Sequence, residues 1–172
     1  DYFGNSVSQS GDLLAVGAYY ADQNGLSRTG AVYVYRVETN GSTAHLAKVT
    51  APNAAAEDYF GNSVSLEGNL LAVGAYEADR NGSNGSKAGT TYLYRVESNG
   101  SVTHQNKITV PDSDPVFGFR FGSSVSQSGD LLAVGAVGAK TVTEPTYLGN
   151  NSGATYLYRI ESNGSATHLA KV

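Results

Sequence analysis

The sequence predicts an all-β protein built from three consecutive four-stranded antiparallel units. Three observations support this: Gly and Tyr are abundant (21 and 12 of 172 residues), similar segments recur in the same order, and each repeat holds four strand-like segments. Abundant Gly and β-favouring side chains indicate short strands joined by tight turns rather than helices. The hydrophobic content of 40% is enough for a buried core.

The repeats are visible at several places in each unit. A Phe-Gly-x-Ser-Val-Ser segment begins at Phe3, Phe60 and Phe121, so the spacing is 57 and then 61 residues. Each copy continues with Leu-Leu-Ala-Val-Gly-Ala, then with Gly-x-x-Tyr-x-Tyr-Arg, and then with an Asn-Gly-Ser turn and a segment containing His. The predicted units cover about residues 1–58, 59–119 and 120–172.

Each unit contains four expected strands in order. The first, which begins at Phe-Gly, has small Ser and Gly side chains that suit a crowded central axis. The second is a continuous apolar run, typical of a strand buried on both faces. The third is rich in Tyr and β-branched residues. The fourth follows an Asn-Gly pair, which favours a two-residue type I′ hairpin turn.

That turn predicts the register of the outer hairpin. With Asn40-Gly41 at its centre, Arg36 lies opposite His45 and Tyr33 lies opposite Lys48. The same register pairs Arg95 with His104 and Arg159 with His168. Copies in different units cannot share one ion, so we interpret the three His as structural cross-strand partners. The paired tyrosines of the third strands are expected to pack between units: Tyr33, Tyr35, Tyr92, Tyr94, Tyr156 and Tyr158.

Four antiparallel strands repeated at this period are typical of a β-propeller blade. The segments Phe-Gly-x-Ser-Val, Ala-Val-Gly-Ala and Gly-Ala-x-Tyr resemble the FG-GAP repeat, whose family includes the integrin α-subunit propeller and many bacterial surface proteins. The resemblance implies a secreted or cell-surface protein. Calcium-binding members carry an Asp-rich loop between the first two strands, whereas here that join has at most one carboxylate, as in Gln9–Asp12. An integrin-type calcium site is therefore not expected in these repeats.

Three blades do not close a propeller, which has roughly four to eight. The chain is therefore expected to be a partial propeller completed by further blades of a parent chain, or half of a six-bladed ring assembled from two copies. The expected partners are accordingly the chain itself, as a homodimer or higher oligomer, or additional blades.

Antiparallel order places the loops between the second and third strands at the same end as the links between blades. These segments vary while the strands repeat, so this end is the expected recognition face. Its candidate ligand-binding residues are Tyr20, Asp22, Asn24, Arg28, Asp58, Glu77, Asp79, Arg80, Asp112, Asp114, Phe117, Arg120 and Tyr147. Asp22 with Asn24, and Asp79 with Asn81, also resemble half of a calcium loop, although turn chemistry explains the same residues.

Other features narrow the classes of function. The net charge of −4 without a basic run disfavours nucleic acid, and the absence of an eighteen-residue apolar run disfavours membrane insertion. Cys is absent, which removes thiol chemistry. Six Asn-x-Ser sequons are possible glycan sites in a eukaryotic secretory protein: Asn40, Asn81, Asn84, Asn99, Asn150 and Asn163.

The favoured function is a binding or adhesion module that presents variable loops to a protein or glycan. The alternative is a structural propeller that self-assembles into a ring or filament. An enzyme with a dispersed site is the third hypothesis and is not expected, because no nucleophile–base pairing or nucleotide-binding loop is evident.

Overall fold

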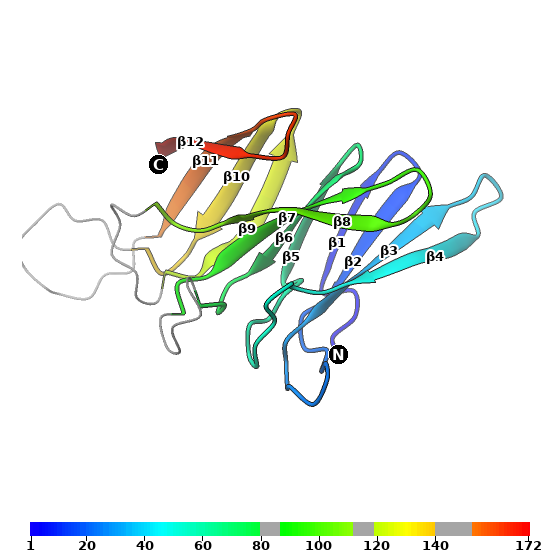
Figure 1. Cartoon of the computed structure of the whole chain (residues 1–172), viewed down its shortest axis with the longest axis horizontal. Coiled ribbons are helices and arrows are strands. Elements are labelled where there is room, and N and C mark those ends of the chain that lie inside the picture. The colour runs from blue at the N-terminus through cyan, green and yellow to red at the C-terminus, as the bar shows by residue number, and fades with distance from the viewer. Residues whose placement is uncertain (80–86, 112–118, 140–152) are drawn as a thin grey trace, which may run out of the picture.

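The computed structural model describes residues 1–79, 87–111, 119–139 and 153–172, and no helix occurs in these ranges. Three twisted four-stranded sheets follow one another along the molecule (Figure 1). The strands are β1 (Ser6–Ser10), β2 (Leu13–Ala18), β3 (Ala31–Val37), β4 (Thr43–Val49), β5 (Ser63–Glu67), β6 (Leu70–Ala75), β7 (Thr90–Val96), β8 (Val102–Ile108), β9 (Phe121–Ser128), β10 (Leu131–Ala136), β11 (Ala154–Ile160) and β12 (Ala166–Lys171). In these ranges no helix is present that could cross a membrane.

Each sheet is a blade whose strands lie side by side in chain order. The first blade has the order β1-β2-β3-β4, the second β5-β6-β7-β8 and the third β9-β10-β11-β12, and every neighbouring pair is antiparallel. This confirms the predicted all-β fold of three four-stranded blades in tandem.

The second strands form the buried middle of the blades. β2, β6 and β10 share the sequence Leu-Leu-Ala-Val-Gly-Ala, and in β6 every residue after Leu70 is buried. The blades on both sides cover β6, so both of its faces need apolar side chains. The continuous apolar run therefore has the role that the sequence predicted for it.

Aromatic side chains join successive blades. Phe60 and Tyr92 are fully buried in the core between the first and second blades, with ring centroids 5.6 Å apart. The Tyr92 hydroxyl bonds to Asn53 Oδ1 (2.9 Å), and the Tyr94 hydroxyl donates to the carbonyl oxygen of Thr50 (2.9 Å). The link between the first and second blades is thus hydrogen bonded to the tyrosines of the second blade. The predicted core role of Tyr92 and Tyr94 is confirmed.

The tyrosines of the other two blades show how burial depends on a neighbouring blade. Tyr156 and Tyr158 are buried against the second blade, as predicted. Tyr33 and Tyr35 occupy the same positions in the first blade but are only half-buried, because no blade precedes theirs in the structure.

The turn of the outer hairpin differs from the predicted two-residue type I′ turn. The Gly41 N–H donates to the Glu38 carbonyl oxygen (2.9 Å), and the Glu38 N–H donates to that of Ser42 (2.8 Å). Gly41 has φ +81°, whereas Asn40 is not among the residues with positive φ. The loop therefore has three residues and ends with Gly in the left-handed conformation, which is the second common way to use Asn-Gly in a hairpin.

This longer loop changes the register near the turn. His45 pairs with Tyr35 rather than with Arg36, and a β-bulge between Val34 and Tyr35 then restores the predicted pairing of Tyr33 with Lys48. The same shift occurs in the other blades, so the predicted Arg95–His104 and Arg159–His168 pairs are wrong as well; the observed partners of these His are Tyr94 and Tyr158. Arg36 instead forms a salt bridge with Asp12 (3.2 Å).

Candidate functional site: a tyrosine strip on the loop face

One end of the molecule collects the loops that follow β2 and β6 and the links between blades, at the lower side of Figure 1. We call this end the loop face; its described residues are 1–5, 19–30, 50–62, 76–79, 87–89, 109–111 and 119–120. Strand order alone places these segments together, because the second and fourth strands of every blade run toward the same end. Side chains from different blades therefore meet there.

Five tyrosines form a continuous group on the loop face, which we call the tyrosine strip: Tyr2, Tyr19, Tyr20, Tyr59 and Tyr76. The Tyr2 ring lies 4.8 Å from that of Tyr20, and Tyr20 lies 5.4 Å from Tyr59, centroid to centroid. Tyr59 stacks on Tyr76 at 5.3 Å with an interplanar angle of 9°. Tyr2 is 64% exposed and the other four rings are half-buried. The strip is thus an aromatic surface shared by the first two blades and open to solvent.

The strip has a repeated backbone basis. Tyr2 and Tyr59 immediately precede Phe-Gly and have φ +53° and +55°, and Arg120 has φ +52° at the same position of the third blade. The Tyr59 carbonyl oxygen accepts the Asn62 N–H (3.2 Å), closing a turn. Left-handed conformations are uncommon for side-chain-bearing residues. This conformation recurs in all three blades, so each blade has one side chain at the loop face just before its Phe-Gly segment.

A row of alternating charges runs along the same face. Arg28 pairs with Glu57 (3.5 Å), which also lies 3.9 Å from Lys87 Nζ. Lys87 in turn contacts Glu77 (3.3 Å), and Glu77 accepts a hydrogen bond from Arg120 Nε (3.1 Å). We call these five residues the ionic row. Each carboxylate thus lies between two cations, and the row includes side chains from all three blades.

The two arginines at the ends of the ionic row also cover rings of the strip. The Arg28 guanidinium lies 5.2 Å from the Tyr20 centroid, and that of Arg120 lies 6.0 Å from the Tyr76 centroid. A side-chain hydrogen bond with Tyr59 raises the pKa of Arg28. Burial, more than any neighbouring charge, raises the pKa of Tyr19 and Tyr76. Like other Tyr hydroxyls, both are protonated at neutral pH and can donate hydrogen bonds.

Four of the predicted ligand-binding residues belong to this site. Tyr20 is part of the tyrosine strip, and Arg28, Glu77 and Arg120 are part of the ionic row. Arg80, Asn81, Asn84, Asp112, Asp114, Phe117, Tyr147 and Asn150 lie outside the described residues.

The two candidate metal-ligand aspartates of the half calcium loops have another role. Asp22 Oδ1 accepts the backbone N–H of Arg28 (2.8 Å), and Asp79 Oδ1 accepts that of Lys87 (3.0 Å). In the first two blades the carboxylate thereby connects the start of the loop to its end, next to an ionic-row cation. Among the described residues no group of three or more His, Asp or Glu is placed to hold a metal ion.

Asn24 lies in a tight turn within the loop that follows β2. Gln23 and Leu26 exchange backbone hydrogen bonds (3.0 and 2.8 Å), and Asn24 and Gly25 both have positive φ, +50° and +81°. This is a two-residue hairpin of type I′, the turn that the sequence predicted for the outer hairpin instead. The Asn24 side chain is exposed, and its backbone conformation explains the residue without a ligand.

The described sequons lie at exposed hairpin turns. Asn40, Asn99 and Asn163 are exposed, and each Oδ1 accepts the backbone N–H of the Ser two residues later (2.9 Å). They lie in the turns between the third and fourth strands, away from the loop face.

Several site residues were absent from the sequence-based prediction: Tyr2, Tyr19, Tyr59, Tyr76 and Lys87. A signal for four of them was present, since Tyr precedes Phe-Gly at positions 2 and 59 and follows Leu-Leu-Ala-Val-Gly-Ala at positions 19 and 76. Antiparallel order brings these two positions of a blade to the same end. The tyrosines could therefore have been grouped from topology alone.

Asp58 is a predicted ligand residue that is buried, with 5% of its surface exposed. Its Oδ2 accepts the backbone N–H of Ala55 (2.7 Å). Burial is the main reason that its pKa rises from 3.8 to about 6; the nearby Asp79 adds to the increase, and the Ala55 hydrogen bond and Lys107 oppose it. Asp58 is thus buried in the link between the first two blades and bonds to the backbone of that link.

This raised pKa makes stability depend on pH. Between about pH 4 and pH 6 the folded state holds the Asp58 proton more tightly than the unfolded state, so the free energy of unfolding contributed by Asp58 falls as pH rises. A two-unit shift corresponds to about 3 kcal/mol. We expect Asp58→Asn to be more stable than the native protein at pH 7 by about 1–2 kcal/mol, since Asn keeps an acceptor for Ala55 but loses the attraction of Lys107.

Urea unfolding of both proteins from pH 3.5 to 8 measures this effect. The difference in unfolding free energy between Asp58→Asn and the native chain should grow from about pH 4 to pH 6 and then stay constant. Parallel pH profiles would show that Asp58 titrates normally.

The described architecture, three antiparallel blades with aromatic contacts between them, is that of a β-propeller-type protein. Solved structures agree: a protein from Lactobacillus plantarum is similar over 98% of this chain (TM-score 0.59, 12% identity), and Sqt1 from Chaetomium thermophilum over 100% (TM-score 0.59, 12% identity). The chain spans 41% and 36% of the length of these two proteins. At this identity the likeness concerns the fold alone.

The sequence itself gives the family. The model of the FG-GAP repeat matches residues 1–35, 44–94 and 102–158, and each of these three segments contains the first two strands of one blade and most of the third. The chain therefore belongs to the FG-GAP repeat family, as the Phe-Gly and Gly-Ala segments predicted. No match was found among proteins of curated function.

Proposed function

We propose that the chain is part of a binding module of a secreted or cell-surface protein, and that the tyrosine strip is the surface that contacts a protein ligand. The observation that carries the proposal is the strip itself, five adjacent rings on the loop face. Membership of the FG-GAP family supports a rigid scaffold that displays loops. The location outside the cell rests on the resemblance to integrin-type propellers.

The composition of the site favours a protein over a glycan. Tyr and Arg are enriched where protein interfaces gain most of their binding energy, because both offer large flat surfaces together with hydrogen-bond donors. The cations of the ionic row are already paired with Glu57 and Glu77, so the row does not offer an uncompensated positive field for an anionic polymer. We propose binding rather than catalysis, since the gathered groups are aromatic rings and paired ions.

The chain offers matched substitutions to test the strip. The third blade has Val137 where the first two have Tyr19 and Tyr76, so Tyr19→Val/Tyr76→Val uses a side chain that this fold accepts there. The native chain is expected to bind at least one member of an array of extracellular proteins. The double variant should lose about 10-fold or more in affinity, because each of the two lost aromatic contacts is worth about 0.5–1.5 kcal/mol.

The control is Thr39→Ala, an exposed residue in the turn between β3 and β4 that should bind like the native chain. Because Trp is absent, intrinsic fluorescence reports on Tyr, and binding at the strip should change it. Binding that survives the double variant would reject the strip as the contact surface. Binding confined to a glycan array and lost in the double variant would keep the surface but reject a protein as its ligand.

A further inference from the structure

The same dipeptide, Asn-Gly, occurs in two kinds of turn within the part of the chain that the structure describes. One copy lies in the loop that follows β2, and one lies in the outer hairpin turn of each blade: Asn24-Gly25, Asn40-Gly41, Asn99-Gly100 and Asn163-Gly164. Asn followed by Gly is prone to deamidation, because glycine has no side chain to hinder attack of its backbone nitrogen on the Asn side chain. Since the dipeptide is the same at all these places, differences in reactivity between them must come from the fold.

The outer hairpin turns hold both groups that would have to react. Each glycine N–H donates to the carbonyl oxygen of the Glu that begins the turn, at 2.9 Å: Gly41 to Glu38, Gly100 to Glu97 and Gly164 to Glu161. Each Asn Oδ1 accepts the backbone N–H of the following Ser at 2.9 Å, and in the first two blades it also accepts the Ser hydroxyl at 2.7 Å. The fold thus opposes both the loss of the glycine proton and the rotation of the Asn side chain.

The turn at Asn24 is built differently. Its two backbone hydrogen bonds are made by the flanking residues Gln23 and Leu26, as in other two-residue hairpins, and the N–H of the central Gly25 is not used. Within the described ranges, neither this N–H nor the Asn24 amide has a hydrogen-bond partner. Both residues are exposed, in the loop after β2 at the lower side of Figure 1. The two groups that react in deamidation are therefore accessible only to solvent at this turn.

We propose that Asn24 is a site of spontaneous deamidation on the loop face, selected by the fold from the four described Asn-Gly pairs. The backbone nitrogen of Gly25 loses its proton and forms a bond to Asn24 Cγ, while the bond from Cγ to Nδ2 breaks and ammonia leaves. Water then opens the resulting succinimide at either of its carbonyl groups, which gives Asp or isoaspartate. The reaction consumes one water and releases one ammonia, and it needs no oxidant or reductant.

The modification changes the loop that carries Tyr20 and Arg28. Either product replaces a neutral amide with a carboxylate. Isoaspartate also adds a carbon atom to the main chain between Gln23 and Leu26, whose hydrogen bonds close the turn. Deamidation at Asn24 is thus a chemical change of both charge and backbone on the loop face.

Peptide mapping by mass spectrometry tests the proposal. The folded chain is incubated at mildly alkaline pH, which favours loss of the glycine proton, and the deamidated fraction is followed at each Asn. Asn24 should react about 10-fold faster than the three outer-turn Asn, because those must first give up at least one hydrogen bond of typical net strength. Labelling with an isoaspartyl methyltransferase should locate isoaspartate in the peptide that contains residue 24.

Two controls separate the fold from the local sequence. In concentrated urea the turns are lost, so the four Asn-Gly pairs should deamidate at similar rates. The variant Asn24→Gly keeps a dipeptide that suits a type I′ turn, because both of its central residues need positive φ. This variant should lose the fast reaction and leave the slow reaction of the outer turns unchanged.

Two outcomes would overturn the proposal. The first is a folded chain in which Asn24 reacts no faster than the outer-turn Asn. The second is the same order of rates in urea, which would assign the difference to neighbouring residues rather than to the fold. Neither experiment uses a ligand, so its failure would leave the proposed binding function of the tyrosine strip untouched.

Discussion

Replacing Phe60 with alanine should lower the free energy of unfolding by about 3–5 kcal/mol, because a fully buried aromatic ring between two blades is lost and a cavity remains. The ring contacts Tyr92 and Tyr94 edge-on, with centroids 5.6 and 6.0 Å away, so its removal also loosens the tyrosines that fasten the link between blades. Urea unfolding followed by far-ultraviolet circular dichroism measures the loss.

The chain provides its own control for this prediction. Phe3 has the same place in the repeat and the same following glycine, but it is 56% exposed. Phe3→Ala should therefore cost less than about 1 kcal/mol. Equal losses for the two variants would show that the Phe-Gly segment stabilises its own blade rather than the contact between blades.

Gly74→Ala should destabilise the protein by about 3 kcal/mol, at the upper end of overpacking effects. The backbone of Gly74 suits any residue, since its φ is not positive, so the cost comes from space alone. The added methyl would meet the carbonyl oxygen of Gly122 and the hydroxyl of Ser63, which are themselves hydrogen bonded to each other (2.8 Å). The second and third blades must then move apart.

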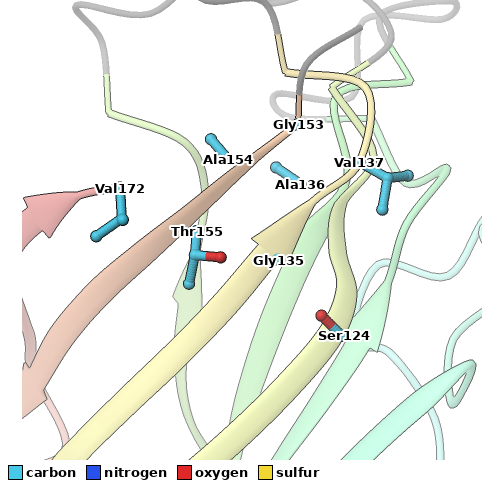
Figure 2. A pocket seen from close by; sticks show the side chains of 8 residues that line it. All are labelled: Ser124, Gly135, Ala136, Val137, Gly153, Ala154, Thr155 and Val172. Atoms are coloured by element: carbon cyan, nitrogen blue, oxygen red, sulfur yellow. The ribbon is translucent and has the colours of Figure 1, made fainter.

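Gly135→Ala is the matched control, because it makes the same change in the third blade. There the nearest atom is the rotatable Ser124 hydroxyl (Figure 2), and we expect a loss below about 1 kcal/mol. Differential scanning calorimetry of both variants compares them directly. A Gly74→Ala protein as stable as Gly135→Ala would contradict the tight approach of neighbouring blades.

Strand identity was the most predictable part of the fold, and the reason is physical. A strand that is covered on both faces, such as β6, needs an uninterrupted apolar run, and few alternative local structures require a run of that length and composition. The register of the outer hairpin was not predictable to the same degree. Asn40-Gly41 is compatible with a two-residue turn and with a three-residue turn, and the bulge beside Tyr35 has no local sequence signal.

The candidate site was predictable in its location but not in its composition. Topology placed Tyr20, Arg28, Glu77 and Arg120 on the loop face, and the structure has them there. The predicted binding residues were mostly charged and polar loop residues, whereas the tyrosine strip is formed by tyrosines that flank the repeated segments. Asp58 illustrates the converse: a carboxylate in a link between blades is expected to be exposed, yet this one is buried and accepts the backbone N–H of Ala55.

The residue before each Phe-Gly segment has a consequence for engineering. Positions 2, 59 and 120 share a left-handed backbone and accept both Tyr and Arg, and at 59 and 120 the Phe-Gly segment that follows is buried against the preceding blade. The residue at the loop face and the Phe that packs between blades are therefore neighbours in the sequence but different residues. A library randomised at these three positions would vary the proposed binding surface while leaving the scaffold sequence intact.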